Sequence, residues 1–287
     1  MKSQFEEKAT NGMFILHIRE GELHGDGILD KKNPTMNTIV FNNGPEQHVK
    51  IDAADHLFPA FSVLPLVANQ HFTFQHPAQL IAWQFNRDFY CIAEHDAEVG
   101  CVGFLFYGIQ HPLFVHLPLE EQVHLQVLQR LCLDDMIVQD QMQGEMLRTL
   151  LKRLIIQITR LAKKQTKNYT QFTAEKMNIV RQFNLLLETH FRRQHEVRFY
   201  ADAMNKSPKT LTNIFGQCQY PAPSKLIQQR IVSEAKRYLL FTKKSAKEIA
   251  DELGFTSMAH FSRFFKQHAG INFSDIKALQ KETASKA

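Results

Sequence analysis

The sequence lacks the features of secreted, disulfide-bonded and membrane-spanning proteins. Its four cysteines are scattered through 287 residues with no C-x-x-C pair, which fits a reducing compartment better than a disulfide framework. We expect the thiols of Cys91, Cys101, Cys132 and Cys218 to be buried and inert. A redox pair between Cys91 and Cys101 is the alternative. The longest apolar run, CVGFLFYGI at 101–109, is far shorter than the ~20 residues that a spanning helix needs. The polar N-terminus has no signal-peptide core, so we predict a soluble, cytoplasmic protein that does not bind membranes.

Catalytic and metal-binding patterns are absent as well. Nine of the 14 histidines fall in residues 1–118, but no H-x-H pair, the pattern of metal-binding cupins, occurs. The sequence has no G-x-S-x-G, phosphate-binding glycine loop or kinase motif. The acidic trio Glu94, Asp96 and Glu98 lies in a turn-like segment, which is typical of a solvated loop. We therefore expect no enzyme activity, no cofactor and no metal.

Charge is distributed unevenly along the chain. Residues 1–118 hold 7 Lys and Arg against 13 Asp and Glu, a net charge of −6. Residues 195–287 hold 15 against 8, a net charge of +7. Basic surfaces are common, but this asymmetry favours a polyanionic partner for the rear of the chain alone.

Short segments rich in β-branched and aromatic residues fill the chain up to about residue 118. Turn formers such as Asn42-Asn43-Gly44-Pro45 separate several of them. The eight expected strands are 14–18, 36–41, 48–51, 58–64, 71–74, 79–85, 89–92 and 102–106. Strands of this length and spacing predict a β-sandwich or a small β-barrel.

The apolar spacing becomes helical from residue 119, and Gly144 divides the region into two predicted helices, 119–141 and 143–164. The apolar stripe consists of Val123, Val127, Leu131, Met146, Leu150, Leu154 and Ile158. Dimerisation is one interpretation of this stripe, and packing on the β-domain's own surface is the other. The polar residues 166–173 are predicted to link these helices to an all-α rear domain, 174–280.

The segment SAKEIADELGFTSMAHFSRFFKQHAG (245–270) contains two short helical patterns separated by Gly254. Ser245 and Glu248 form a capping box, and Gly254 suits the left-handed conformation that ends a helix. Met258, Phe261, Phe264 and Phe265 are expected to anchor the second helix. Its outward residues are Ser257, Ala259, His260, Ser262, Arg263 and Lys266. An aromatic anchor with a small, hydrogen-bonding outer face predicts a helix-turn-helix unit that reads the major groove.

The same plan occurs about fifty residues earlier. Asn205 replaces the left-handed glycine, Ser207 caps the next helix, and Pro208 occupies its first position. Leu211, Ile214 and Phe215 form the expected anchor, and the outward residues are Lys209, Thr210, Thr212 and Asn213. A predicted helix at 224–241 lies between the two units and spans roughly 27 Å. This length is close to the ~34 Å that separates successive major-groove faces of B-DNA.

These residues resemble the AraC/XylS family of bacterial transcription regulators. The resemblance covers about 180–280 and is most specific at IADELGFTSMAHFSRFFKQHAG; YADAMNKSPKTLTNIF and QQRIVSEAKRYLL follow the family less tightly. It implies double-stranded DNA as the partner and two DNA-reading units per chain. By position, the predicted DNA-binding residues are Ser207, Lys209, Thr210, Thr212, Asn213, Ser257, Ala259, His260, Ser262, Arg263 and Lys266, the last near phosphate.

The chain also departs from the family's pattern. Tyr220 and Gly216 stand where the family commonly has a glycine and a basic residue. Phe273, Ile276 and Lys277 stand where it has proline and Tyr-Arg. Because the first reading helix carries fewer basic side chains, we predict that the second dominates affinity.

The β-rich front followed by two helices is similar, in architecture alone, to the family's cupin-like effector domain and dimerisation helices. This similarity implies a small-molecule effector, a homodimer and, for an activator, RNA polymerase as a further partner. The effector is then expected to change the relative placement of the two DNA-reading units. A dry effector pocket would be lined by aromatic residues that serve equally well as plain core: Phe61, Phe72, Phe74, Trp83 and Phe85.

The sequence thus predicts an α+β multidomain regulator. Residues 1–118 form a cupin-like jelly-roll barrel, 119–165 the dimerisation helices, 166–173 a linker, and 174–280 the DNA-binding domain. One alternative is a cupin-type enzyme with an accessory helical domain, which a bound metal or turnover would favour. The other is an architectural DNA-binding protein without an effector, which ligand-insensitive binding would support.

Overall fold

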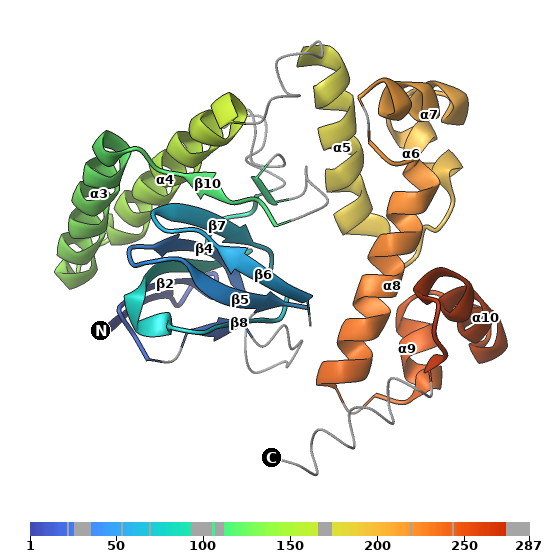
Figure 1. Cartoon of the computed structure of the whole chain (residues 1–287), viewed down its shortest axis with the longest axis horizontal. Helices are drawn as coiled ribbons and strands as arrows, with labels where there is room; N and C mark the ends of the chain where they lie inside the picture. The colour runs from blue at the N-terminus through green and yellow to red at the C-terminus, as the bar shows by residue number, and fades with distance from the viewer. Residues whose placement is uncertain are drawn as a thin grey trace. The chain divides into compact units, whose positions relative to one another are not determined.

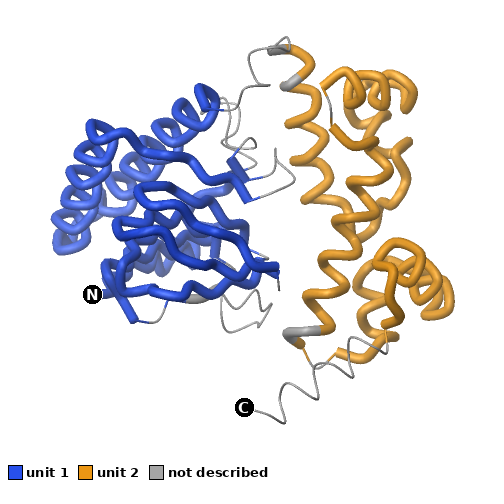
Figure 2. The backbone as a smooth tube through the Cα atoms, viewed as in Figure 1, with its two compact units in different colours: residues 1–171 blue, residues 172–287 orange. Residues whose placement is uncertain are grey.

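The computed structural model describes residues 1–21, 23–25, 36–52, 54–68, 70–92, 105–106, 112–165, 174–218, 220–242 and 244–273. The chain divides into two compact units, residues 1–171 and 172–287 (Figure 2). The first unit combines β-sheets with two long helices, and the second is helical in its described part. No described helix combines the length and the hydropathy needed to cross a membrane.

Two antiparallel sheets form the core of the first unit. The larger has the strand order β1-β2-β9-β4-β7-β10 and the smaller has the order β3-β8-β5-β6. The strand bounds are β1 Lys2–Glu7, β2 Gly12–Ile18, β3 His24–Gly25, β4 Met36–Asn42, β5 Gln47–Ile51, β6 Ala54–Phe58, β7 Ser62–Leu66, β8 Phe72–Phe74, β9 Leu80–Asn86 and β10 Val115–His116, with a short 3-10 helix at Pro77–Gln79. Among the described residues these strands form two open sheets, so the predicted closed barrel is wrong for this part of the chain.

The larger sheet is buried on both faces, because successive side chains of a strand point to opposite sides. In β9, Ile81 and Trp83 belong to an apolar cluster shared with the helices. Leu80 and Ala82 belong to a second cluster shared with the smaller sheet. The first unit therefore has three layers: helices, large sheet and small sheet (Figure 1).

Helices α3 (Leu119–Ile137) and α4 (Gln143–Gln165) form the helical layer. Leu147, Leu151 and Ile158 of α4 are fully buried against the sheet cluster. Of the predicted stripe on α4, Leu154 and Ile158 pack on the chain's own β-sheet, as the packing interpretation expects, whereas Met146 is half-exposed; dimerisation through these helices stays a prediction. Val123, Val127 and Leu131 of α3 remain exposed.

Several predicted strands differ from the observed ones. The expected strand 58–64 is split by a turn at Phe61, whose φ of 52° is left-handed, and its two halves belong to β6 and β7. Residues 89–92 form no strand, and β1, β3 and β10 were not predicted. Most of the expected strand 102–106 lies outside the described residues.

The second unit contains six described helices, and every helix predicted for it is present. They are α5 (Ala174–His190), α6 (Val197–Ala203), α7 (Pro208–Gln217), α8 (Pro223–Phe241), α9 (Ala246–Glu252) and α10 (Met258–Ala269). Within this unit α8 runs as an axis, with α6 and α7 beside one end and α9 and α10 beside the other (Figure 1). The expected linker 166–173 and the domain end at 280 lie outside the described residues.

Candidate nucleic-acid interface

The turn of the first helix-turn-helix unit, between α6 and α7, is closed by backbone hydrogen bonds. Asn205 has a left-handed φ of 52°. Its N–H donates to the carbonyl of Asp202 at 3.1 Å, and the N–H of Lys206 donates to Ala201 at 2.9 Å. These bonds satisfy carbonyls that the end of a helix otherwise leaves without partners.

The turn of the second unit, between α9 and α10, repeats these bonds 49 residues later. Gly254 has a φ of 73°. Its N–H donates to Asp251 at 3.1 Å, and the N–H of Phe255 donates to Ala250 at 2.9 Å. The predicted repeat is thus present at the level of single hydrogen bonds.

Both recognition helices begin with a serine cap, as predicted. Ser207 Oγ accepts from the N–H of Thr210 at 3.0 Å, and Ser257 Oγ accepts from the N–H of His260 at 3.2 Å. The capping box of Ser245 and Glu248 is also present. The Thr210 hydroxyl lies 2.8 Å from Ser207 Oγ, so two of the predicted DNA-binding side chains, Ser207 and Ser257, also cap their own helices and a third contacts a cap.

The inner faces of the recognition helices carry most of the expected anchors. Leu211, Phe215, Phe261 and Phe265 are fully buried, whereas Ile214 and Phe264 are partly buried. The prediction that Met258 belongs to this anchor is wrong. Its side chain is half-exposed, because Met258 is the first residue of α10 and lies one turn before the buried face begins.

The outer faces carry the predicted DNA-binding residues. All are exposed apart from the half-buried Ser262: Ser207, Lys209, Thr210, Thr212, Asn213, Ser257, Ala259, His260, Arg263 and Lys266. Thr212 Oγ1 donates to the carbonyl of Pro208 at 3.0 Å, so its hydroxyl has an acceptor site left for a base. The His260 ring lies edge-on to Phe255 at 5.3 Å, which orients it. Their contacts with DNA stay a prediction.

The loop between α5 and α6 contacts the turn of the second helix-turn-helix unit. A Cβ placed on Gly254 would lie 2.4 Å from the carbonyl oxygen of Arg192. The Arg193 guanidinium donates to the carbonyl of Asp251 at 3.2 Å, and the His195 ring lies 4.8 Å from that of Phe255. The loop between α5 and α6 therefore links the two helix-turn-helix units directly.

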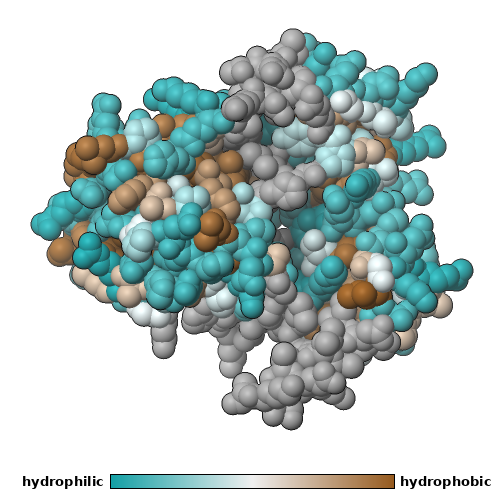
Figure 3. All heavy atoms as spheres, viewed as in Figure 1, coloured by the Kyte–Doolittle hydropathy of each residue, from teal (hydrophilic) through white to brown (hydrophobic). Residues whose placement is uncertain are grey.

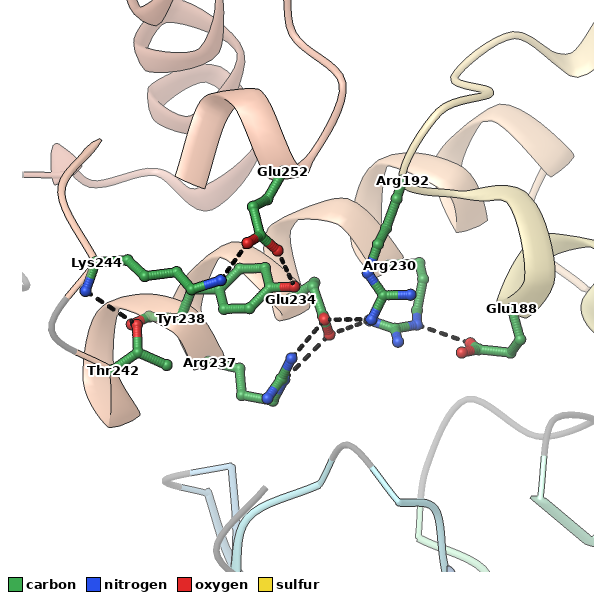
Figure 4. A network of polar contacts seen from close by, with 9 residues as sticks. All are labelled: Glu188, Arg192, Arg230, Glu234, Arg237, Tyr238, Thr242, Lys244 and Glu252. Atoms are coloured by element: carbon green, nitrogen blue, oxygen red, sulfur yellow. Dashed lines mark hydrogen bonds and ion pairs between the residues drawn. The ribbon is translucent and has the colours of Figure 1, made fainter. Parts of the chain in front are cut away.

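A buried ionic network supports this junction from α8 (Figure 4). The carboxylate of Glu234, 1% exposed, accepts from Arg192 at 2.7 Å, Arg230 at 3.0 Å and Arg237 at 2.5 Å. Arg230 also donates to Glu188 of α5 at 2.7 Å. Burial alone would raise the pKa of Glu234, but the Arg230 charge and the Arg237 hydrogen bond outweigh it and hold this pKa well below its ordinary value.

A second set of polar contacts ties α8 to α9. Glu252 accepts from the hydroxyl of Tyr238 at 3.1 Å and also from Lys244. The Lys244 hydrogen bond is the main cause that lowers the pKa of Glu252. Sequence reasoning missed both sets of contacts; the only signal was Glu234 and Arg237 on the same side of α8 as the buried Ile227 and Ile231.

The five predicted effector-lining residues do not meet in one pocket. Phe72 and Phe74 pack together between the two sheets, with ring centroids 5.5 Å apart. Trp83 and Phe85 point to the opposite face of the large sheet, toward the helices, and Phe61 is 41% exposed on a turn. These residues do not share one lining, because β8 belongs to the smaller sheet while Trp83 and Phe85 lie on the face of β9 that turns away from it; contact of any of them with an effector stays a prediction.

A buried polar row, which sequence reasoning also missed, lies on the inner side of the large sheet. His17 Nε2 is 2.7 Å from Gln84 Oε1, and Gln84 Nε2 donates to Thr38 Oγ1 at 3.1 Å. Burial lowers the pKa of His17. These strands face the smaller sheet, so the row offers hydrogen-bonding groups inside an otherwise apolar layer.

The cysteines and histidines form no recognisable reactive centre in the described part of the chain. Cys91, Cys132 and Cys218 are buried, and burial raises the pKa of the Cys132 thiol to about 12. No group of three or more His, Cys, Asp or Glu side chains there is placed to hold a metal ion. Cys101 and the acidic trio of residues 94, 96 and 98 lie outside the described residues.

Comparisons with known proteins agree with the geometry of the second unit. Residues 200–278 match the family model of a helix-turn-helix domain, and the resemblance of this region to AraC-type regulators is confirmed. No curated protein matches the chain.

Among solved structures the chain is similar to ToxT from Vibrio cholerae. An apo variant of ToxT has 13% identity and a TM-score of 0.40, with 94% of this chain and 98% of that chain covered. ToxT bound to an unsaturated fatty acid has 16% identity and a TM-score of 0.41, with 94% and 96% covered. A third ToxT structure has 11% identity and a TM-score of 0.40, with 95% and 94% covered.

Proposed function

We propose that this chain, whose residues 200–278 form an AraC-type helix-turn-helix domain, is a sequence-specific transcriptional regulator that reads two adjacent major grooves. The observation that carries the proposal is the doubled motif, with the same turn bonds, the same serine caps and two exposed polar faces. Nineteen residues of α8 span about 28 Å. This length suits two recognition helices in successive grooves on one side of a duplex.

The side chains divide into base-reading and phosphate-binding groups. Arg263 is the candidate for a bidentate contact with guanine, and Asn213 is the candidate for adenine. Lys209 and Lys266 are placed near phosphates. Thr212, Ala259, His260 and Ser262 would complete the surface that faces the bases, and the caps Ser207 and Ser257, with Thr210 beside the first, would lie at the rims of the two grooves.

The rest of the chain has a regulatory role in this proposal. Residues 1–118 form a cupin-like effector domain, 119–165 mediate homodimerisation, and 166–173 link them to the DNA-binding domain, 174–280. The buried polar row on the large sheet supports an effector site between the sheets, because such groups orient a small ligand in an apolar interior. An activator of this kind would also contact RNA polymerase.

The test is selection of a binding site from random duplex DNA by the full chain, followed by anisotropy titrations at increasing salt. Affinity should fall steeply with salt, because each phosphate contact releases counterions. Arg263→Ala should weaken binding about 5- to 150-fold and relax the preference at one base pair. Lys50→Ala, which removes an exposed charge from β5, should change neither. A chain that selects no sequence at low ionic strength would contradict the proposal.

A further inference from the structure

The hairpin that α3 and α4 form exposes apolar side chains at its tip, residues 134–147. Four of these side chains are exposed by 78%, 46%, 61% and 50%: Ile137, Val138, Met142 and Met146. In Figure 3 brown side chains lie among teal ones where Figure 1 draws this hairpin. Grouped apolar exposure is typical of a contact surface, and methionine adapts its shape to a partner.

Hydrogen bonds hold the hairpin tip in one conformation. The Gln143 side-chain amide donates to the carbonyls of Asp135 at 2.9 Å and Met136 at 3.2 Å, so the start of α4 lies against the end of α3. The Asp140 carboxylate accepts from the N–H of Met142 at 2.8 Å. A surface that is ordered before binding loses less conformational entropy when a partner arrives. The exposed apolar side chains therefore have a pre-formed support.

The hairpin tip packs on its own chain through a different side. Leu147 is fully buried in the cluster shared with the large sheet. Gly144 is also buried, and a Cβ placed on it would lie 3.2 Å from the Phe5 ring of β1. Arg148 pairs with Glu7 of β1 at 2.7 Å. A partner can therefore cover the exposed side of the tip without displacing any of these contacts.

The charge of the hairpin tip is negative. Residues 134–147 contain no Lys, Arg or His and four acidic side chains: Asp134, Asp135, Asp140 and Glu145. Two arginines lie just outside this range, and Arg130 pairs with Asp134 at 3.1 Å. Arg148 pairs with Glu145 at 3.3 Å. Counting both arginines still leaves a net charge of −2. The C-terminal end of α3 adds negative potential, because its last turn carries no basic residue.

This charge decides which class of partner fits. DNA and anionic lipid surfaces carry the same sign as the hairpin tip and are repelled. Two copies of the tip that faced each other would also bring like charges together, which is unfavourable. A protein segment that carries Lys or Arg beside apolar side chains complements both the apolar and the acidic part of the surface.

From the exposed apolar side chains and the acidic residues around them we propose that the hairpin tip is a docking surface for a basic amphipathic segment of another protein. Ile137, Met142 and Met146 supply the apolar contact. Asp135 and Asp140 supply partners for Lys or Arg. The inference goes beyond the proposed function, because it concerns neither the recognition helices nor DNA.

The first test measures how the full chain binds a fluorescent peptide of about 18 residues, long enough to form a helix, with Leu and Lys at helical spacing. Met142→Ser should weaken binding about tenfold, because the peptide then buries less apolar surface. The thermal unfolding midpoint should not change, since Met142 is exposed. Leu57→Ser is the matched control, because Leu57 is 48% exposed on β6, and it should leave the affinity unchanged.

Three results of this titration would overturn the proposal. The first is equal loss of affinity in Met142→Ser and Leu57→Ser, and the second is no loss in either variant. The third is equal binding of a peptide that has the same composition in an order without an apolar face, because net charge alone would then explain the attraction.

The second test concerns the acidic side chains. Asp140→Asn removes one charge and keeps an oxygen that accepts the N–H of Met142. It should weaken peptide binding about threefold at low salt, since exposed ion pairs contribute little, and the difference should vanish at high salt. Asp55→Asn removes an exposed charge from β6 and should have no effect. Equal effects of the two variants would overturn the proposal.

Other occupants of the hairpin tip would give different results. A Met142→Ser chain with a lower mass than the wild type in sedimentation equilibrium would show that a second copy covers the tip. Co-sedimentation with phosphatidylcholine–phosphatidylglycerol vesicles that Met142→Ser abolishes would show a membrane contact. Either result would overturn the proposal.

The docking surface and the proposed function fail separately. A chain that selects a DNA sequence but does not bind the peptide would overturn the docking surface alone. A chain that binds the peptide through the hairpin tip but ignores duplex DNA would overturn the proposed function alone.

Discussion

The two helix-turn-helix units share one backbone but are stabilised by different cores. In the first helix-turn-helix unit Tyr200 and Phe215 pack on Phe183 of α5, with ring centroids 5.1 Å and 5.0 Å apart. In the second unit Phe255, which follows the left-handed glycine, packs on Phe261 at 5.2 Å and on Phe264 at 5.1 Å. The first unit thus depends on a neighbouring helix for its aromatic centre, whereas the second carries its own.

This difference arises at one position of the repeat. Lys206 occupies in the first turn the place that Phe255 occupies in the second, and both donate the same backbone hydrogen bond. Lys206 is exposed and Phe255 is 6% exposed. The turn geometry therefore depends on backbone bonds and a left-handed residue, while the packing around it can change between copies.

The largest effects are expected from removing the two aromatic centres. Phe183→Ala and Phe255→Ala should each destabilise the helical unit, residues 172–287, by about 3–5 kcal/mol, because each leaves a large cavity. Hydrogen exchange should show that Phe183→Ala exposes α7 first and that Phe255→Ala exposes α10 first. Equal loss of protection in both helices from either variant would contradict the distinction between the two cores.

Glu234→Gln should have the next largest effect, because it leaves three arginines without their shared charge. We expect a loss of about 3 kcal/mol, the low end for breaking a buried ion pair, since the amide still accepts a hydrogen bond. Urea unfolding would measure it. Glu188→Gln is the matched control, because the Glu188 carboxylate pairs with Arg230 and is partly exposed, and it should cost about 1 kcal/mol.

The same substitution should change the response to acid. The pKa of Glu234 in the fold lies below its ordinary value of 4.5, so the unfolded chain binds the proton more readily. The stabilisation is therefore present above pH 4.5 and is lost as the pH falls below it. Glu234→Gln should flatten the stability curve in that window, and a curve as steep as that of the wild type would contradict this assignment.

Gly254→Ala should cost more than Asn205→Ala, although both replace the left-handed residue of a turn. Alanine in this conformation costs about 1–2 kcal/mol, and at Gly254 its Cβ would also meet the Arg192 carbonyl. We expect about 3 kcal/mol for Gly254→Ala, about 1 kcal/mol for Asn205→Ala and almost no change for Asn205→Gly. Chemical denaturation tests the order, and equal costs for the two alanine variants would show that the Arg192 contact is unimportant.

The smallest effects concern DNA affinity without a change in stability. Arg263→Ala should weaken binding to the selected site by about 1–3 kcal/mol, and Asn213→Ala should weaken it less. The reason is that α10 carries Arg263 and Lys266, whereas α7 carries only Lys209 as a basic residue. A titration in which Asn213→Ala loses as much as Arg263→Ala would reverse the predicted ranking.

Sequence reasoning succeeded where structure depends on neighbouring residues in the chain. Gly254, Asn205 and the serine caps could be predicted because a left-handed residue and an N-cap act within one helical turn. It failed for Phe61, whose left-handed conformation divides an apparently continuous strand. It also placed Trp83 with Phe72, although only the tertiary fold decides which face of a sheet a strand presents to which neighbour.

The contacts between the two helix-turn-helix units could not be predicted either, because they also depend on the tertiary fold. Arg192 and Glu234 are 42 residues apart, and nothing in the spacing of either pairs them. The stripe on α3 was predicted, but it could not be distinguished from the stripe on α4 until the structure showed which of them the sheet covers.

The carbonyl of Arg192 lies so close to Gly254 that the α5–α6 loop would hold the two recognition helices at one fixed spacing. DNA binding at a fixed spacing depends on the helical phase of the two DNA positions that are read. About five extra base pairs between them, half a turn of duplex, would rotate one position to the far side of the DNA. The interval between the two reading positions would be set by the protein, and the operator would have to match it.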